Sequence, residues 1–241
     1  MEVRGTNLTI EQSNYLTIKF LKMKTALIAG ASGLTGSYLL KLLLESKTYS
    51  TVKVLVRKQL DIEHPLLQQI VYDYENPNSA EINADHVYCC LGTTMKKAGS
   101  KEAFKKVDYE YPLQIARAAQ QNGAEKFALV SAMGANSKSM FFYNKVKGQL
   151  EEALKEVPYK ATHIFHPSIL LGPRHESRFG EELGKKLMKA FKFFIPVNMK
   201  PIHASQVAAC MQDYMKGEER GIHIIPSGQM QKYSIRKAID I

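Results

Sequence analysis

The sequence predicts an α/β protein built on a doubly wound parallel sheet. Short apolar, β-branched segments alternate with segments of helical periodicity up to about residue 166, and such alternation requires a parallel sheet covered on both faces. Residues 85–91 are apolar almost throughout, as expected of a strand buried on both faces. With 45% hydrophobic and 23% charged residues, the chain has enough apolar material for such a core.

Six strands are expected in the first two thirds of the chain, each a short apolar or β-branched segment. They cover residues 24–30, 51–56, 69–73, 85–91, 125–131 and 161–166. Leucines spaced along one helical face predict a helix from residue 34 to about 46. Two longer helices are expected over 101–122, where Asn122-Gly123 ends the helix, and over 143–156, which Pro158 stops.

The C-terminal part is less regular. Helices near 180–194 and 205–216 are expected, and 220–225 could form a strand. We interpret residues 167–241 as a small substrate lobe over the carboxyl edge of the sheet, within one domain that spans residues 23–241. Residues 1–22 are polar and unpatterned, so a poorly ordered extension is expected there. Met23 is an alternative start to Met1.

Composition argues against several classes of protein. Three cysteines without a pattern indicate reduced thiols, and the seven histidines lack zinc-binding spacing, so no metal site is expected. No apolar run approaches the roughly 18 residues of a membrane span. The N-terminus lacks the apolar core and cleavage site of a signal peptide. These observations predict a cytoplasmic location.

The chain is basic, with 33 Lys plus Arg against 23 Asp plus Glu and a formal net charge of +10. This charge favours anionic partners, but no helix-turn-helix, zinc finger or RNP-type pattern predicts dedicated nucleic-acid binding. The lysines of segment 96–106 could attract an anionic cofactor or form a solvated helix face. The basic, amphipathic segment 180–200 could bind a protein partner or a membrane surface, or pack its apolar stripe on the core.

A glycine-rich turn, GASGLTG, joins the first strand to the first helix. Gly30 permits a tight turn, Gly33 lets the backbone approach a pyrophosphate, and Gly36 lets the helix pack closely on the sheet. The N-terminus of the helix offers free N–H groups and a partial positive charge to phosphates. In a first βαβ unit this spacing predicts a dinucleotide-binding loop and the Rossmann form of the fold.

Residues after the next strands point to the rest of a cofactor site. Arg57 and Lys58 follow the second strand, where NAD-specific proteins usually carry Asp or Glu; an Arg suits a 2′-phosphate, so NADP(H) is expected in preference to NAD(H). A solvated basic pair is the alternative. Asp73 could bond the adenine amino group or be an ordinary loop residue. Leu91 and Gly92 follow the fourth strand, where Gly allows the cofactor's second half to approach.

Tyr143 and Lys147 form a YxxxK pair, whose side chains share one helical face at positions i and i+4. An ammonium beside a phenol lowers the pKa of the phenol, which favours proton transfer near neutral pH. Lys147 can also bond the nicotinamide ribose. Ser131 ends the fifth strand and could hold a substrate carbonyl beside the phenol. A surface Tyr/Lys pair is the alternative, but the dinucleotide loop favours the catalytic interpretation.

Together these segments resemble the short-chain dehydrogenase/reductase superfamily in its atypical NAD(P)-binding branch, and most closely the Tat-interacting-protein-like oxidoreductases. The similar stretches lie between about residues 25 and 182: GASGLTG, CCLGTTMKKAG, VDYEYPLQIARAA, SAMGAN, YNKVKGQLE and ILLGPRHESRFGE. The resemblance implies an NADPH-binding Rossmann fold with a Ser/Tyr/Lys group. It implies that the cofactor site also includes Ser32, Leu34, Thr35, Leu170 and Arg178. Two departures, Ala132 for a second Ser and His166-Pro167-Ser168 for Arg-Pro-Gly, leave the substrate geometry open.

The function expected from these residues is an NADP(H)-dependent oxidoreductase that moves a hydride between the nicotinamide and a small carbonyl or alcohol substrate. Tyr143 would be the general acid, Lys147 would tune it and Ser131 would orient the carbonyl. Two alternatives stay open. One is an NADPH-sensing regulatory protein with little turnover, and the other is an epimerase or isomerase that recycles its cofactor.

Overall fold

The computed structural model describes residues 23–173 and 196–235. Its centre is a seven-stranded sheet with the order β3-β2-β1-β4-β5-β6-β9, in which every neighbouring pair is parallel. In chain order these strands are β1 (Lys24–Ala29), β2 (Tyr49–Val56), β3 (Leu67–Val71), β4 (His86–Cys89), β5 (Lys126–Val130), β6 (Ala161–His166) and β9 (Gly221–Pro226). The predicted α/β fold with a doubly wound parallel sheet is confirmed.

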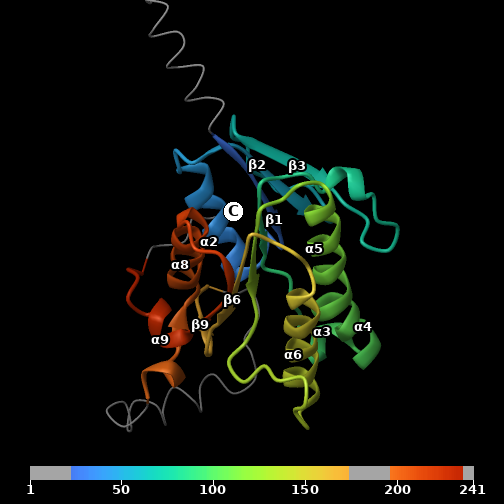
Figure 1. The fold of residues 1–241 in the computed structure, drawn as a ribbon, viewed down its shortest axis with the longest axis vertical. Coiled ribbons are helices and arrows are strands. Elements are labelled where there is room, and N and C mark those ends of the chain that lie inside the picture. The colour runs from blue at the N-terminus through green and yellow to red at the C-terminus, as the bar shows by residue number, and fades with distance from the viewer. Residues whose placement is uncertain (1–22, 174–195, 236–241) are drawn as a thin grey trace, which may run out of the picture.

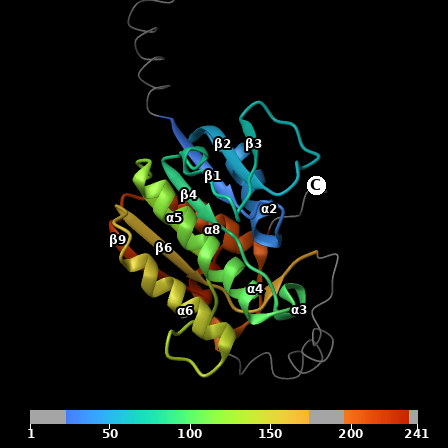
Figure 2. The same cartoon turned by 90° about the vertical axis from the view of Figure 1, so that its right-hand side faces the viewer.

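Helices cover both faces of the sheet (Figures 1 and 2). On one face lie α2 (Leu34–Leu44) and α8 (Ala204–Lys216), and on the other lie α5 (Tyr111–Gln121) and α6 (Phe142–Lys155). Alternate residues of β1 point to opposite faces of the sheet. Ile28 packs on the side of α2 and α8, and Leu27 packs on the side of α5 and α6. In the part of the chain that the structure describes, no helix is long and apolar enough to cross a membrane.

The alternation of strands and helices is less regular than predicted. No helix joins β2 to β3 in the described chain, and only a 3-10 turn, Ser79–Glu81, lies between β3 and β4. The third strand also runs two residues earlier than expected. Pro65 and Pro77 stand in these connections, and each lacks the amide hydrogen that a helix interior requires.

The helix predicted over residues 101–122 is three consecutive elements. A short helix α4 (Lys101–Lys105) leads into a π-helical turn (Lys106–Glu110), and α5 follows. Pro112 lies in the first turn of α5 and has no N–H for the carbonyl of residue 108, so the regular ladder is interrupted there. Another short helix, α3 (Met95–Ala98), precedes α4. The interrupted segment carries Asp108, which becomes important at the candidate site.

Much of the segment predicted as a substrate lobe belongs to the main layers. β9 is the seventh strand of the sheet, and α8 packs against α2. What lies apart is a two-stranded parallel pair, β7 (Leu170–Leu171) with β8 (Ile202–His203), together with a 3-10 turn (Val197–Met199) and α9 (Ser227–Met230). The expected helix near 180–194 and the expected extension 1–22 lie outside the described residues.

Three polar side chains are buried on the α8 side of the sheet. Lys126 donates hydrogen bonds to the carbonyl oxygens of the last turn of α8. His86 and His163 are 2% and 0% exposed, and among the described residues neither ring nitrogen of His163 has a hydrogen-bond partner. Burial, reinforced by nearby positive charge, lowers the pKa of His86 to about 3 and that of His163 to about 4.

Acid is therefore expected to destabilise the fold through these two histidines. Below a pH of about 6.5 the unfolded chain binds their protons while the folded chain does not, so the free energy of unfolding falls as the pH falls towards 4. The loss is at most about 1.4 kcal/mol per pH unit for each histidine. Urea unfolding between pH 7 and 4.5 measures it. His163→Phe should flatten the slope, the same change at exposed His64 should not, and an unchanged slope in His163→Phe would contradict the assignment.

Candidate active site

The glycine-rich loop between β1 and α2 has a shape that only glycine allows at two positions. Gly30 has φ +86°, and a Cβ there would lie 2.8 Å from the carbonyl carbon and oxygen of Cys90. A Cβ on Gly36 would lie 2.0 Å from the carbonyl oxygen of Gly30. The first contact sets the loop against the end of β4, and the second draws the start of α2 onto the loop. The predicted roles of Gly30 and Gly36 in backbone packing agree with this geometry.

The N-terminus of α2 is open to an anion. Gly33 is the N-cap residue, no side chain of the described chain caps the helix, and Ser32 and Gly33 are exposed. The first N–H groups of an 11-residue helix are therefore available together with its partial positive charge. Thr35 is 5% exposed, so its hydroxyl has little access to a ligand. The loop fits a pyrophosphate.

The segment after β6 closes over this loop. Leu170 is half-buried in β7, and Leu170 and Leu34 both pack against the apolar cluster on the α2 and α8 side. A Cβ on Gly172 would lie 2.8 Å from a methyl carbon of Leu34, so this segment contacts the loop closely. Leu170 thus lies beside the predicted cofactor loop, while Arg178 lies outside the described residues.

Arg57 and Lys58 lie exposed at the carboxyl end of β2. Burial raises the pKa of nearby Tyr74, and the positive charge of Arg57 acts in the opposite direction. Asp73 lies two residues beyond β3, and its carboxylate accepts hydrogen bonds from the Glu75 N–H and the Asn76 side chain, both at 2.9 Å. These bonds lower the pKa of Asp73. Its carboxylate therefore stabilises its own turn, and the alternative bond to the adenine amino group stays a prediction.

Lys147 is held in a buried ion pair that the sequence analysis did not identify. Its Nζ lies 2.9 Å from Asp108 Oδ1, and the two side chains are only 4% and 1% exposed. The other oxygen of Asp108 accepts a hydrogen bond from the Thr93 N–H at 2.8 Å. Burial alone would lower the pKa of Lys147, but Asp108 and then Tyr143 raise it, and the net shift is upward. Lys147 therefore stays charged.

This ion pair lies under the loop that follows β4. A Cβ on Gly92 would lie 3.5 Å from Asp108 Oδ1 and 3.7 Å from Lys147 Nζ. Gly92 is exposed and Leu91 is half-buried, so the ammonium lies just beneath an accessible stretch of backbone. The structure thereby brings together Gly92 and Lys147, both of which are predicted from the sequence to face the cofactor's second half.

Tyr143 lies in the first turn of α6, one turn before Lys147, and is 38% exposed. Its ring centroid lies 5.7 Å from that of buried Phe104 in α4. Its position on α6 and this ring contact set the direction of the phenol, and its exposure leaves it accessible to a substrate. The predicted YxxxK geometry on one helical face is present.

Ser131 does not have the arrangement expected of a carbonyl-orienting residue. It is 5% exposed, and its hydroxyl donates a hydrogen bond to Glu151 Oε1, two turns after Tyr143 on α6. His166 Nε2 lies 2.9 Å from the same oxygen. A serine has one hydroxyl hydrogen to donate, so Ser131 cannot also donate to a substrate carbonyl in this arrangement. The sequence signal for Glu151 was its position at i+8 on the YxxxK face.

Comparisons with known proteins agree with this geometry. A family model described as NAD(P)H-binding matches residues 30–170. HTATIP2 of Rattus norvegicus is 38% identical over 172 residues, which are 69% of this chain and 71% of that protein. The mitochondrial protein FMP52 of Lodderomyces elongisporus is 35% identical over 213 residues, covering 80% of this chain and 89% of that protein.

The predicted cytoplasmic location is contradicted by these relatives. The FMP52 proteins of Lodderomyces elongisporus, Candida albicans and Debaryomyces hansenii are all named as mitochondrial. The prediction was wrong because it rested on cysteine usage and on criteria for secretory signals, and neither separates the cytoplasm from an organelle that lies off the secretory route.

Solved structures share the fold at low sequence identity. MoeE5 in complex with UDP-glucose and NAD has a TM-score of 0.65 at 14% identity, over 83% of this chain and 74% of that chain. UDP-N-acetylglucosamine 4-epimerase from Methanobrevibacter ruminantium M1 has the same score and identity, over 85% and 77% of the two chains. From the family match and the two relatives we conclude that this chain belongs to the NAD(P)H-binding Rossmann family that includes HTATIP2 and FMP52.

Proposed function

We propose that the protein is an NADP(H)-dependent oxidoreductase that reduces the carbonyl group of a small substrate. The observation that carries this proposal is the accessible Tyr143 phenol one helical turn from Lys147, whose charge Asp108 maintains beneath Gly92. This pair lies at the same sheet edge as the open N-terminus of α2, since both follow the carboxyl ends of parallel strands. A dinucleotide held by that N-terminus would extend along the edge towards Gly92.

The chain's own residues would act in binding and in proton transfer. The N–H groups at Ser32, Leu34 and Thr35 would hold the pyrophosphate, and Lys147 would bond the ribose beneath Gly92. The bound cofactor supplies a hydride to the carbonyl carbon. Tyr143 donates its hydroxyl proton to the carbonyl oxygen, so that an alcohol results and the phenol recovers its proton from solvent. Asp108 keeps the ammonium charged and fixed in direction throughout.

The preference for NADPH over NADH rests on Arg57, with Lys58 beside it. An Arg57→Glu variant should lose about 10- to 100-fold in NADPH affinity, since one or two charge-assisted bonds to the 2′-phosphate are replaced by repulsion. Its NADH affinity should change little or improve. Fluorescence titration with each nucleotide measures both values. Arg220→Glu makes the same charge change at the amino end of β9 and is the control. Equal wild-type affinity for NADH and NADPH would refute the preference.

One observation favours the regulatory alternative. The Ser131 hydroxyl is committed to Glu151, which leaves Tyr143 without a second donor from Ser131 at the carbonyl and would suit a protein that binds NADPH with little turnover. Carbonyl compounds mixed with protein and NADPH separate the candidates. Saturable oxidation of NADPH supports the oxidoreductase, tight binding without oxidation supports the sensor, and substrate conversion without net oxidation supports an epimerase.

A further inference from the structure

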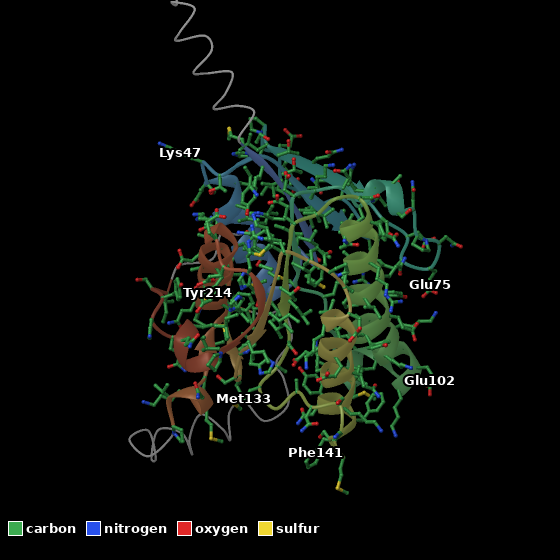
Figure 3. The ribbon with its side chains drawn as sticks, in the orientation of Figure 1. Lys47, Glu75, Glu102, Met133, Phe141 and Tyr214 are labelled. Atoms are coloured by element: carbon green, nitrogen blue, oxygen red, sulfur yellow. The ribbon has the colours of Figure 1, made fainter. Side chains whose placement is uncertain are left out.

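Large apolar side chains lie exposed on the loop after β5, on the segment after β6 and in the 3-10 turn before β8. Met133 is 40% exposed, Ile169 is 53% exposed and Met199 is 54% exposed. We call these three residues the apolar rim. Figure 3 shows Met133 towards the same end of the molecule as Phe141, the N-cap residue of α6, and far from Lys47. Met133 therefore lies towards the end of the molecule where α6 begins.

Backbone contacts place the segments that carry Met133 and Ile169 next to each other, and the Met133 segment next to the first turn of α6. Gly134 packs against Asn144, since a Cβ on Gly134 would lie 3.2 Å from Asn144 Nδ2. On the other side, the Met133 N–H donates to the Pro167 carbonyl at 3.0 Å. The next segment runs alongside, because the Ile202 N–H donates to the Ile169 carbonyl at 2.9 Å. Met133 thus lies between the first turn of α6 and the segment that carries Ile169.

The segments around the apolar rim also lack acidic residues. Segments 131–142, 166–173 and 196–203 contain no Asp or Glu. The same three segments contain only two Lys or Arg residues, Lys138 and Lys200. A clustered apolar surface beside a reactive phenol gains free energy when an apolar ligand covers it.

We infer that the substrate is an aldehyde or ketone with an extended apolar body, which lies over the apolar rim while its carbonyl oxygen meets Tyr143. This inference rests on the proposed reductase function and adds the substrate class to it. In this reaction a hydride from NADPH would join the carbonyl carbon, a proton from Tyr143 would join the oxygen, and the products would be an alcohol and NADP⁺. Nucleotide sugars, which the solved neighbours of similar fold contain, offer no such apolar body.

A series of straight-chain aldehydes from butanal to decanal tests the inference with the full-length protein and NADPH. Each methylene that reaches the rim should raise kcat/KM by up to about fourfold, the factor expected for full burial of one CH₂ group. UDP-glucose at millimolar concentration should not inhibit decanal reduction. If kcat/KM is independent of chain length while turnover still requires Tyr143, the substrate class is wrong and the reductase function stands. If no aldehyde is reduced at all, the proposed function itself fails.

Two matched isoleucine variants test whether the chain-length dependence of kcat/KM comes from the apolar rim or from any loss of surface hydrophobicity. Ile169→Gln should reduce the gain in kcat/KM per methylene. Ile222→Gln, which alters a similarly exposed isoleucine (44%) on β9, should leave the whole series as in the wild type. Equal effects of the two variants would overturn the inference. Sedimentation with phosphatidylcholine vesicles covers the competing role: if Ile169→Gln abolishes vesicle binding and leaves the chain-length series unchanged, the rim contacts membranes and not substrate.

Discussion

Replacing Asp108 by Asn should lower the free energy of unfolding by about 3 kcal/mol, because it leaves the Lys147 ammonium buried without its counter-charge. Asparagine keeps the shape and can still accept the Thr93 N–H bond, so the loss reports the charge. Urea unfolding measures it, with Asp73→Asn at an exposed carboxylate as the control. A change below about 0.5 kcal/mol would show that the ion pair does not hold Lys147 charged.

The same variant should also impair turnover in a characteristic way. Without Asp108 the pKa of Lys147 falls, since burial is then opposed only by weaker contributions. The alkaline limb of the pH profile of kcat/KM should therefore move to lower pH, which a purely structural defect would not produce. In the Asp108→Asn/Lys147→Met double variant, stability should recover while turnover stays lost, because the buried charge is then removed and Asn still accepts the Thr93 N–H bond.

Replacing Tyr143 by Phe should reduce kcat by about 10²- to 10⁴-fold, the contribution typical of a general acid. The dissociation constant for NADPH should stay within about threefold of the wild-type value, because the phosphate loop and Arg57 are untouched. Tyr143 is partly exposed, so the lost hydroxyl should cost little stability. Tyr214→Phe, in α8 on the opposite face, is the control. Turnover in Tyr143→Phe equal to that of the wild type would remove Tyr143 from the mechanism.

Local patterns were enough to predict most of the fold. Strand β4 is apolar almost throughout because helices cover both faces of the sheet. The spacing of Gly30, Gly33 and Gly36 reflects backbone contacts within a single loop. The predictions were wrong for the connections in which prolines exclude a helix. They also missed that β9 joins the main sheet. Pairing of β9 with β6 joins residues far apart in sequence, and no local pattern encodes it.

The candidate site was predictable only in part, for a similar reason. Tyr143 and Lys147 were identified because they lie one helical turn apart. Asp108 comes from the interrupted helix before α5 and meets Lys147 across two elements. A buried lysine requires an opposite charge, so the need for a partner was predictable but its identity was not. The predicted role of Ser131 stays a prediction, but its hydroxyl hydrogen goes to Glu151, two turns along α6, a contact that its own strand does not reveal.

Transfer of deuterium from NADPH labelled at C4 of the nicotinamide is the most direct measurement of the central claim. Mass spectrometry of the alcohol formed from decanal should show one deuterium on the carbinol carbon with wild-type protein and a rate at least 10²-fold lower with Tyr143→Phe. NADPH that binds at the phosphate loop but passes no deuterium to any carbonyl substrate would contradict the claim and identify the protein as a cofactor-binding regulator.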